Sequence, residues 1–178
     1  MRLHSSPTIE ERTTPYTTKH TTMHYFLNIG SNLGNTKLNI SRALRALEEK
    51  FGYFETSKIM ESKPWGFVSP HTFANLAVMI VTDRTPQEVL ADIKEIESRL
   101  NPTPHRTPEG AYADRILDID IMAADNMTVE SDSLTLPHPH LAERLFFLEP
   151  FNELAPMWRH PVTGKTCGYM IAEIPKSE

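Results

Sequence analysis

The stretch AYADRILDIDIM, residues 111–122, alternates apolar and polar residues as a half-buried β-strand does. Successive side chains of a strand point to opposite faces, so Ile119 and Ile121 share one face while Asp118 and Asp120 share the other. Residues two apart in a strand have Cα atoms roughly 6.5–7 Å apart, so the two carboxylates can bracket one cation or a pair. The pattern predicts a strand with two carboxylates side by side.

Two interpretations of this carboxylate pair are open from the residues alone. The polar face of a half-buried strand is normally solvated, and that is sufficient for one aspartate. Aspartate is depleted in strands, however, and like charges on one face repel unless a cation or a donor compensates them. Arg115 lies just upstream, where it can reach a phosphate bound to such cations. A solvated face and a metal or phosphate site are equally favoured.

Length and composition limit the classes of protein to which this chain can belong. With 178 residues, 39% of them apolar, the chain can bury a core as one domain. The formal charge of −5 argues against a general nucleic-acid or anionic-membrane surface. The single cysteine, Cys167, excludes an internal disulfide and suits a reducing cytoplasm. No run approaches the roughly 18–20 apolar residues of a membrane span. We expect a cytoplasmic protein with no membrane or nucleic-acid partner.

The N-terminal segment differs from the rest of the chain. Residues 1–22 are rich in Ser, Thr and charged residues and show no hydrophobic period, which is typical of a flexible tail. We therefore expect a flexible tail over 1–22 and a single folded domain over 23–178. No internal repeat is found, and we expect a monomer or a weak homodimer.

The first half of the domain reads as a strand, a turn and a helix. Residues 25–29 alternate as a strand does, and apolar residues from 40 to 51 recur at helical spacing. Between them lies GSNLGN, residues 30–35. It matches neither common glycine-rich phosphate-binding motif, so Gly30 and Gly34 are interpreted as turn residues.

Two more strands and a helix follow. Apolar runs predict strands at 53–60 and 73–82. A helix is predicted to begin after Thr85, because Thr, then Pro, then Glu three residues after the Thr form a capping box. With the strand over 111–122 the order is β-α-β-β-α-β. This order is typical of an α+β, ferredoxin-like fold with a mostly antiparallel sheet and helices packed on its faces.

Three loops carry residues that can bind ligands. In SKPWGFVSPH, residues 62–71, Trp65 and Phe67 either fold under as a small local core or form the wall of a ligand site. The proline-rich segment 101–110 precedes the aspartate strand, where a lid is expected. In LTLPHPHL, residues 134–141, no Cys or carboxylate has a matching spacing, so neutral polar contacts are favoured over zinc.

Three motifs occur in a fixed order along the chain: GSNLGN at 30–35, a Pro/aromatic loop ending in FANLAV at 73–78, and DRILDIDIM at 114–122 followed by LPHPHLAERLFFLEP at 136–150. In these motifs the chain resembles the 6-hydroxymethyl-7,8-dihydropterin pyrophosphokinases of folate synthesis, over residues 25 to 156. The resemblance implies transfer of pyrophosphate from ATP, as co-substrate, to the pterin hydroxymethyl group, with AMP as the other product.

The resemblance also implies roles for particular residues. Asp118 and Asp120 are expected to hold two Mg2+ ions between the enzyme and ATP, and Arg115 to contact the phosphates. The expected substrate-binding residues are Ser62, Trp65, Phe73, Asn75 and Phe146. The expected nucleotide-binding residues are Glu97, Tyr112, His138 and Arg144.

The chain departs from the family pattern just before the aspartates. Ala111 to Asp114 stand where the family commonly has a basic residue, Trp, Gly and Pro, so one positive charge and some rigidity are missing there. Tyr112 keeps the aromatic role, and Arg106 of the preceding loop is the expected catalytic substitute for the charge. The departure leaves an alternative function, a catalytically weakened pterin-binding protein of the same fold.

Overall fold

The computed structural model describes residues 21–101 and 113–175. Its main sheet has five strands in the order β2-β4-β1-β5, with β3 paired to the same edge of β4 as β2. Every pairing in this sheet is antiparallel. The strands are β1 (Met23–Ser31), β2 (Phe54–Thr56), β3 (Met60–Ser62), β4 (Phe73–Thr82) and β5 (Asp118–Ala124). A separate two-stranded sheet joins β6 (Val129–Glu130) to β7 (Thr135–Leu136).

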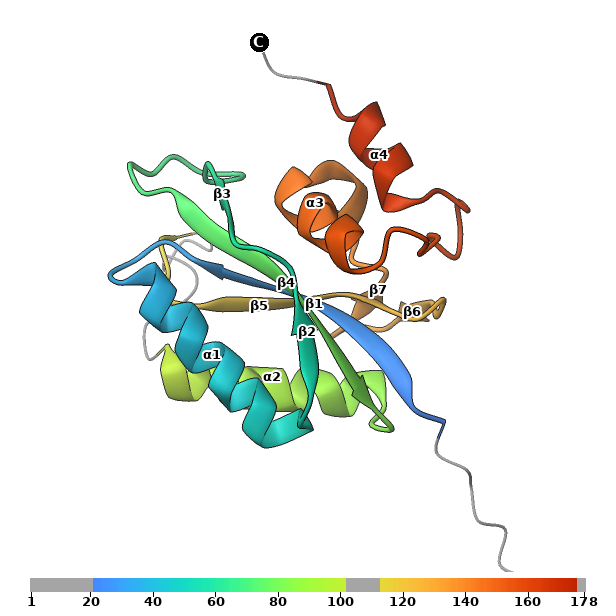
Figure 1. The fold of residues 1–178 in the computed structure, drawn as a ribbon, viewed down its shortest axis with the longest axis horizontal. Coiled ribbons are helices and arrows are strands. Elements are labelled where there is room, and N and C mark those ends of the chain that lie inside the picture. The colour runs from blue at the N-terminus through green and yellow to red at the C-terminus, as the bar shows by residue number, and fades with distance from the viewer. Residues whose placement is uncertain (1–20, 102–112, 176–178) are drawn as a thin grey trace, which may run out of the picture.

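Helices cover both faces of the sheet (Figure 1). One face carries α1 (Thr36–Phe51) and α2 (Pro86–Leu100), and the other carries α3 (Leu145–Leu154) and α4 (Cys167–Glu173). A short 3-10 helix, η1 (Leu141–Glu143), precedes α3. The predicted α+β, ferredoxin-like fold is confirmed. Among the described residues no helix is both long and apolar enough to cross a membrane.

Side-chain caps mark the starts of α1 and α2, and the start predicted after Thr85 is confirmed. The Asn35 side chain accepts a hydrogen bond from the Leu38 backbone N–H at 3.0 Å. Thr85 and Glu88 form a complete capping box at the start of α2. These contacts satisfy N–H groups that have no partner within the first turn of a helix.

The strand predicted over 53–60 is two short strands, β2 and β3. At Ser57, between them, the side-chain hydroxyl accepts the hydrogen bond of the Ala77 N–H at 2.9 Å. A side chain thereby replaces the backbone carbonyl that a regular ladder would use, and the ladder is interrupted. The strand β3 then leads into the aromatic loop.

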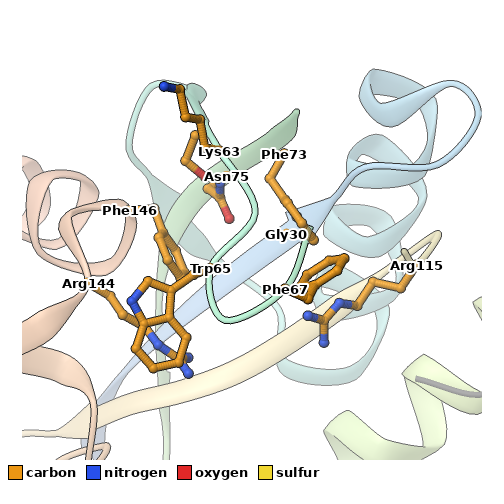
Figure 2. A pocket seen from close by; sticks show the side chains of 10 residues that line it. Gly30, Lys63, Trp65, Phe67, Phe73, Asn75, Arg115, Arg144 and Phe146 are labelled. Carbon is orange, nitrogen blue, oxygen red and sulfur yellow. Dashed lines mark hydrogen bonds between the residues drawn. The ribbon is translucent and has the colours of Figure 1, made fainter. Parts of the chain in front are cut away.

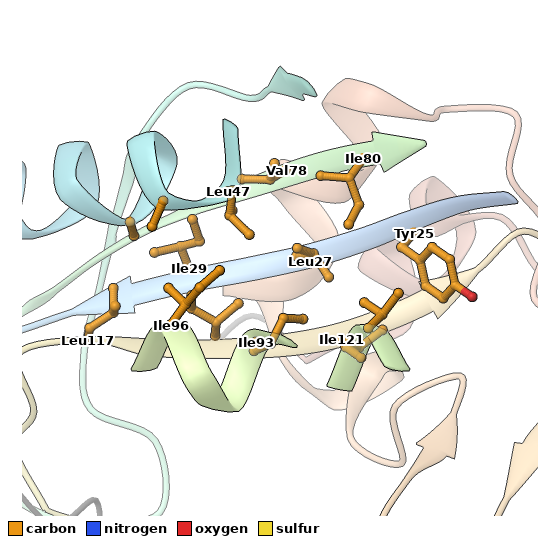
Figure 3. Close-up of a cluster of buried hydrophobic side chains, with 14 of the residues drawn as sticks. Tyr25, Leu27, Ile29, Leu47, Val78, Ile80, Ile93, Ile96, Leu117 and Ile121 are labelled. Atoms are coloured by element: carbon orange, nitrogen blue, oxygen red, sulfur yellow. The ribbon is translucent and has the colours of Figure 1, made fainter. Parts of the chain in front are cut away.

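Two apolar clusters lie on opposite faces of the sheet, as the alternation predicts. Side chains such as Tyr25, Leu27 and Ile29 of β1 pack with α1 and α2, shown in Figure 3. On the other face, Phe26 packs with α3 and α4. Farther along that second face, the larger apolar side chains of β1 give way to Asn28 and a glycine. The face is therefore apolar at one end and polar at the other.

Candidate active site

A pocket lies at the polar end of the second face, between the sheet, the aromatic loop and α3 (Figure 2). All five predicted substrate-binding residues line it, together with Arg115, Arg144, Phe67 of the aromatic loop, and two residues that the sequence did not single out as ligand-binding, Gly30 and Lys63. The lining residues are Gly30, Ser62, Lys63, Trp65, Phe67, Phe73, Asn75, Arg115, Arg144 and Phe146. Of the two interpretations of the aromatic loop, the pocket supports the wall of a ligand site.

The floor of the pocket is an amide held by a hydroxyl. Asn75 is 2% exposed, and its Nδ2 donates to Ser62 Oγ at 2.8 Å. Gly30 lies opposite Asn75 in the register of β1 and β4. A Cβ atom at Gly30 would lie 3.0 Å from Asn75 Oδ1, closer than side chains normally approach. Gly30 is thus more than a turn residue, because it leaves room for the amide.

Arg144 forms one side of the pocket. It is buried, and its guanidinium carbon lies 4.2 Å from the centroid of the Trp65 ring and 4.9 Å from that of Phe147. Stacking of this kind stabilises a cation away from water. Its Nε has no hydrogen-bond partner among the described residues. The pocket therefore has a positive wall with a hydrogen-bond donor still to be used.

Arg115 links the pocket to the aspartate strand. It is buried, and its guanidinium carbon lies 5.5 Å from the Phe73 ring centroid. Its Nη1 lies 3.0 Å from Asp118 Oδ2. One guanidinium therefore contacts both an aromatic ring of the pocket and the first carboxylate.

Asn32 holds Asp114 and Arg115 just before the aspartate strand. Asn32 donates from its Nδ2 to Asp114 Oδ1 at 2.6 Å and accepts from the Arg115 N–H at 2.8 Å. The Asn32 N–H also donates to the Arg115 carbonyl at 3.1 Å. Three hydrogen bonds with Asn32 therefore hold Asp114 and the Arg115 backbone, at the end of the segment where the sequence lacks the family's rigid residues. The missing positive charge is not replaced by these contacts.

Asp118 and Asp120 share the second face of β5, as predicted, and lie opposite Gly30 and Asn28 of β1. Burial, and then the charge of Asp118, raises the pKa of Asp120, while Arg144 opposes this shift. Two carboxylates that repel in this way suit a hard divalent cation. Among the described residues no cluster of three His, Cys, Asp or Glu forms a metal site. Mg2+ needs only one or two carboxylates, so the donor set fits it.

Glu97, near the end of α2, contacts the aspartate strand directly. Its Oε1 accepts a hydrogen bond from the Ile119 N–H at 2.7 Å, between the two aspartates along the chain. Burial, and secondarily the charge of Asp118, raises its pKa to about 7, although the Ile119 hydrogen bond opposes the shift. The predicted nucleotide-binding residue therefore lies at the outer edge of β5, where it also fixes the strand.

Replacing Glu97 with Gln is expected to change how the stability of the metal-free protein depends on pH. The pKa of Glu97 is about 7 in the folded protein against 4.5 ordinarily, so between these values the unfolded chain releases a proton that the folded chain keeps. The wild-type free energy of unfolding therefore falls between pH 4.5 and 7, by on the order of 2 kcal/mol once partial exposure is allowed for. The variant should lack this fall.

Urea unfolding of both proteins at several pH values from 4 to 8 measures this difference. The two proteins should match at the acid end, and Glu97→Gln should be more stable above pH 7. Parallel curves for the two proteins would show that Glu97 ionises normally in the folded state.

His138 lies beside the carboxylate strand but outside the pocket lining. Its backbone N–H donates to the Met122 carbonyl at 2.8 Å, and its Nδ1 accepts from the His140 N–H at 3.1 Å. Burial, then the charges of Arg144 and His140, lowers its pKa to about 4. A neutral imidazole agrees with the predicted polar contact. Arg106 and Tyr112, the other predicted residues, lie outside the described residues.

Two site residues were not predicted from the sequence, Asn32 and Lys63, and Phe67 was predicted only as one of two alternatives, a local core or a ligand wall. Lys63 and Phe67 lie in the aromatic loop, where only the resemblance selected particular positions. Asn32 lies in GSNLGN, and its partners follow it by more than 80 residues in the chain. No local pattern predicts such a contact.

The chain is similar to known proteins over most of its length. The family model of 7,8-dihydro-6-hydroxymethylpterin-pyrophosphokinase (HPPK) matches residues 26–156. A 2-amino-4-hydroxy-6-hydroxymethyldihydropteridine pyrophosphokinase of Porphyromonas gingivalis is 39% identical over 135 residues, which are 75% of this chain and 90% of that protein. The protein of the same name from Aquifex aeolicus is 34% identical over 137 residues, 77% of this chain and 83% of its own.

Solved structures show the same fold. A Plasmodium falciparum HPPK-DHPS crystal structure matches with a TM-score of 0.66 and 17% identity, over 86% of this chain. This chain spans only 44% of that one. Because the family model covers residues 26–156 and carries the pocket and the aspartate pair, the chain belongs to the 7,8-dihydro-6-hydroxymethylpterin-pyrophosphokinase family.

Proposed function

We propose that this chain transfers a pyrophosphoryl group from ATP to the hydroxymethyl group of 6-hydroxymethyl-7,8-dihydropterin, with release of AMP. The observation that carries the proposal is the contact of Arg115 with both Phe73 of the pocket and Asp118 of the carboxylate pair. Arg115 thus connects the aromatic pocket, which has the Asn75 amide at its floor, to a site for phosphate-bound cations. The family membership and its named relatives support the same reaction.

The pocket suits a flat heterocycle that carries hydrogen-bonding edges. Asn75, held by Ser62, presents an amide at the floor, and Phe73 and Phe146 offer ring faces or edges to a bound pterin. Trp65 lies on the Arg144 side of the pocket (Figure 2). These residues would orient the ring so that its hydroxymethyl group points toward the aspartates, and orientation of this kind lowers the barrier to in-line attack.

The residues beyond the pocket would handle ATP. Asp118 and Asp120 would hold Mg2+, two ions in this proposal, and bound Mg2+ neutralises phosphate charge during transfer. Arg115 supplies a fixed positive charge beside Asp118, suited to a phosphate oxygen. Arg144 has an unused donor, and Glu97 and His138 lie next to the carboxylate strand. We assign these three, with Tyr112 and Arg106, to nucleotide binding and phosphate contacts.

The direct test is the product pattern. The protein, incubated with ATP, Mg2+ and the pterin, should release AMP and pterin diphosphate, separable by ion-exchange chromatography. Formation of ADP, or no product at any enzyme concentration, would overturn the proposal. Tight pterin binding in calorimetry without ATP binding would instead favour the weakened pterin-binding protein, which the comparisons do not support.

Replacing Asn75 with Ala should raise the KM for the pterin by about 10- to 100-fold, because a site built to hydrogen-bond a polar edge discriminates strongly when that bond is lost. The KM for ATP should change little. Steady-state kinetics with each substrate varied in turn measures the split. Asn126→Ala, in an exposed turn, is the control. Equal increases in both KM values would show a general disturbance of the fold.

We further propose that residues 23–178 act as a single domain in the cytoplasm, as a monomer or weak homodimer, with no nucleic-acid or membrane partner. The charge of −5 supports the absence of a nucleic-acid partner. Most of the expected tail, residues 1–20, lies outside the described residues.

A further inference from the structure

Asn28 of β1 carries a buried acceptor that nothing in the described part of the chain satisfies. The residue is 2% exposed, and its Oδ1 has no hydrogen-bond partner there. Buried amide oxygens in folded proteins are almost always paired, so an exception calls for an explanation such as a bound ion or water. Asn28 was not among the predicted site residues.

The neighbours of Asn28 explain why the oxygen stays unpaired. In the register of the sheet, Asn28 lies opposite Ala77 of β4 on one side and opposite Asp120 of β5 on the other. Ala77 has no side-chain donor, and Asp120 in the ionised form that holds a cation only accepts. Along β1 the same face continues to Phe26 and Gly30, which also lack side-chain donors. These neighbours on the same face of the sheet therefore offer Asn28 Oδ1 no side-chain donor when Asp120 is ionised.

The same position places Asn28 beside the carboxylate pair. Side chains directly opposite on neighbouring strands have Cβ atoms about 4.5–5.5 Å apart, so an amide oxygen and a carboxylate oxygen there can reach one ion. Amide oxygens are accepted ligands of hard divalent cations. We infer that Asn28 Oδ1 is a third protein oxygen of the cation site formed by Asp118 and Asp120.

The inference rests on the metal site of the proposed function and can be tested without turnover. Mn2+ alone is titrated into the full-length protein, and free Mn2+ is followed by electron paramagnetic resonance. Asn28→Ala is expected to weaken Mn2+ binding about tenfold, as loss of a metal-site partner does elsewhere. Asn28→Asp, which keeps an oxygen at the position and adds charge, should bind at least as tightly as wild type. Asn126→Ala is the matched control.

Thermal unfolding without metal separates this role from a structural one. Removing an unpaired buried polar group should leave the Tm of Asn28→Ala unchanged or higher. A lower metal-free Tm with unchanged Mn2+ affinity would mean that Asn28 only supports the sheet, and the inference would fail. It would also fail if Asn28→Asp bound Mn2+ more weakly than Asn28→Ala. Asp keeps an oxygen at this position and Ala does not, so such a result would show that the oxygen of residue 28 is no ligand.

Asp120→Asn distinguishes failure of the inference from failure of the metal site. If wild type binds Mn2+ and Asp120→Asn weakens it while Asn28→Ala does not, only the role of Asn28 is refuted. If Asp120→Asn also leaves Mn2+ binding unchanged, both the inference and the metal site of the proposed function are refuted.

Discussion

Asp120→Ala is expected to lower kcat for AMP release by about a thousandfold or more, and Asp118→Ala by a similar factor. A cation that stabilises transferring phosphate supplies several kcal/mol, and each 1.4 kcal/mol is about a tenfold change in rate. The two carboxylates lie on one face of β5, and burial together with Asp118 raises the pKa of Asp120. Removal of either partner leaves one carboxylate to hold the cations.

Pterin affinity should be largely spared in both variants, because neither aspartate lines the aromatic pocket. Rapid-quench measurement of AMP gives the rate, and fluorescence titration with the pterin gives its Kd. Asp132→Ala, at an exposed loop position, is the matched control and should keep the wild-type rate. Wild-type turnover in either site variant would remove the metal role from this pair.

Arg115→Ala is expected to lower kcat by about a thousandfold, the lower end of the effect of a phosphate-contacting arginine in phosphoryl transfer. The guanidinium is buried between Phe73 and Asp118 and is held through its backbone by Asn32. Its charge is therefore fixed in place before ATP arrives. Arg115→Lys should recover only part of the loss, because lysine keeps the charge but not the planar fork of donors.

Single-turnover kinetics with saturating ATP and pterin isolates the chemical step for these arginine variants. Arg99→Ala, at an exposed position on α2, is the control for loss of a positive charge. If Arg115→Ala raised the KM for ATP and left kcat unchanged, Arg115 would act in ground-state binding of ATP rather than in the transfer step.

Much of the fold was predictable because its signals are local. The apolar run over 73–82 predicted the bounds of β4, and the Thr85 capping box predicted the start of α2. Both patterns depend on residues a few positions apart, where chain geometry alone sets which side chains share a face. The break between β2 and β3 was not predicted, because it depends on a hydrogen bond from Ala77 to Ser57, 20 residues away in the chain.

The candidate site also contains residues that the sequence predicted and contacts that it did not predict. The motifs selected the pocket residues Ser62, Phe73 and Asn75, and the structure brings them together. The hydrogen bonds of Asn32 with Asp114 and Arg115 were not predicted, because these residues lie more than 80 positions apart in the chain. The contacts that a side chain makes depend on the tertiary fold. The residue types of a motif do not specify them.

The sequence by itself determined that Asp118 and Asp120 share one face of a strand, because side chains alternate along any extended chain. Only the tertiary structure decided what surrounds them. The antiparallel register of β1 and β5 places Asn28 opposite Asp120, and the packing of α2 brings Glu97 to the Ile119 N–H. These partners are more than 20 residues apart, and their meeting depends on strand pairing and helix packing, which the periodicity of a single segment does not encode.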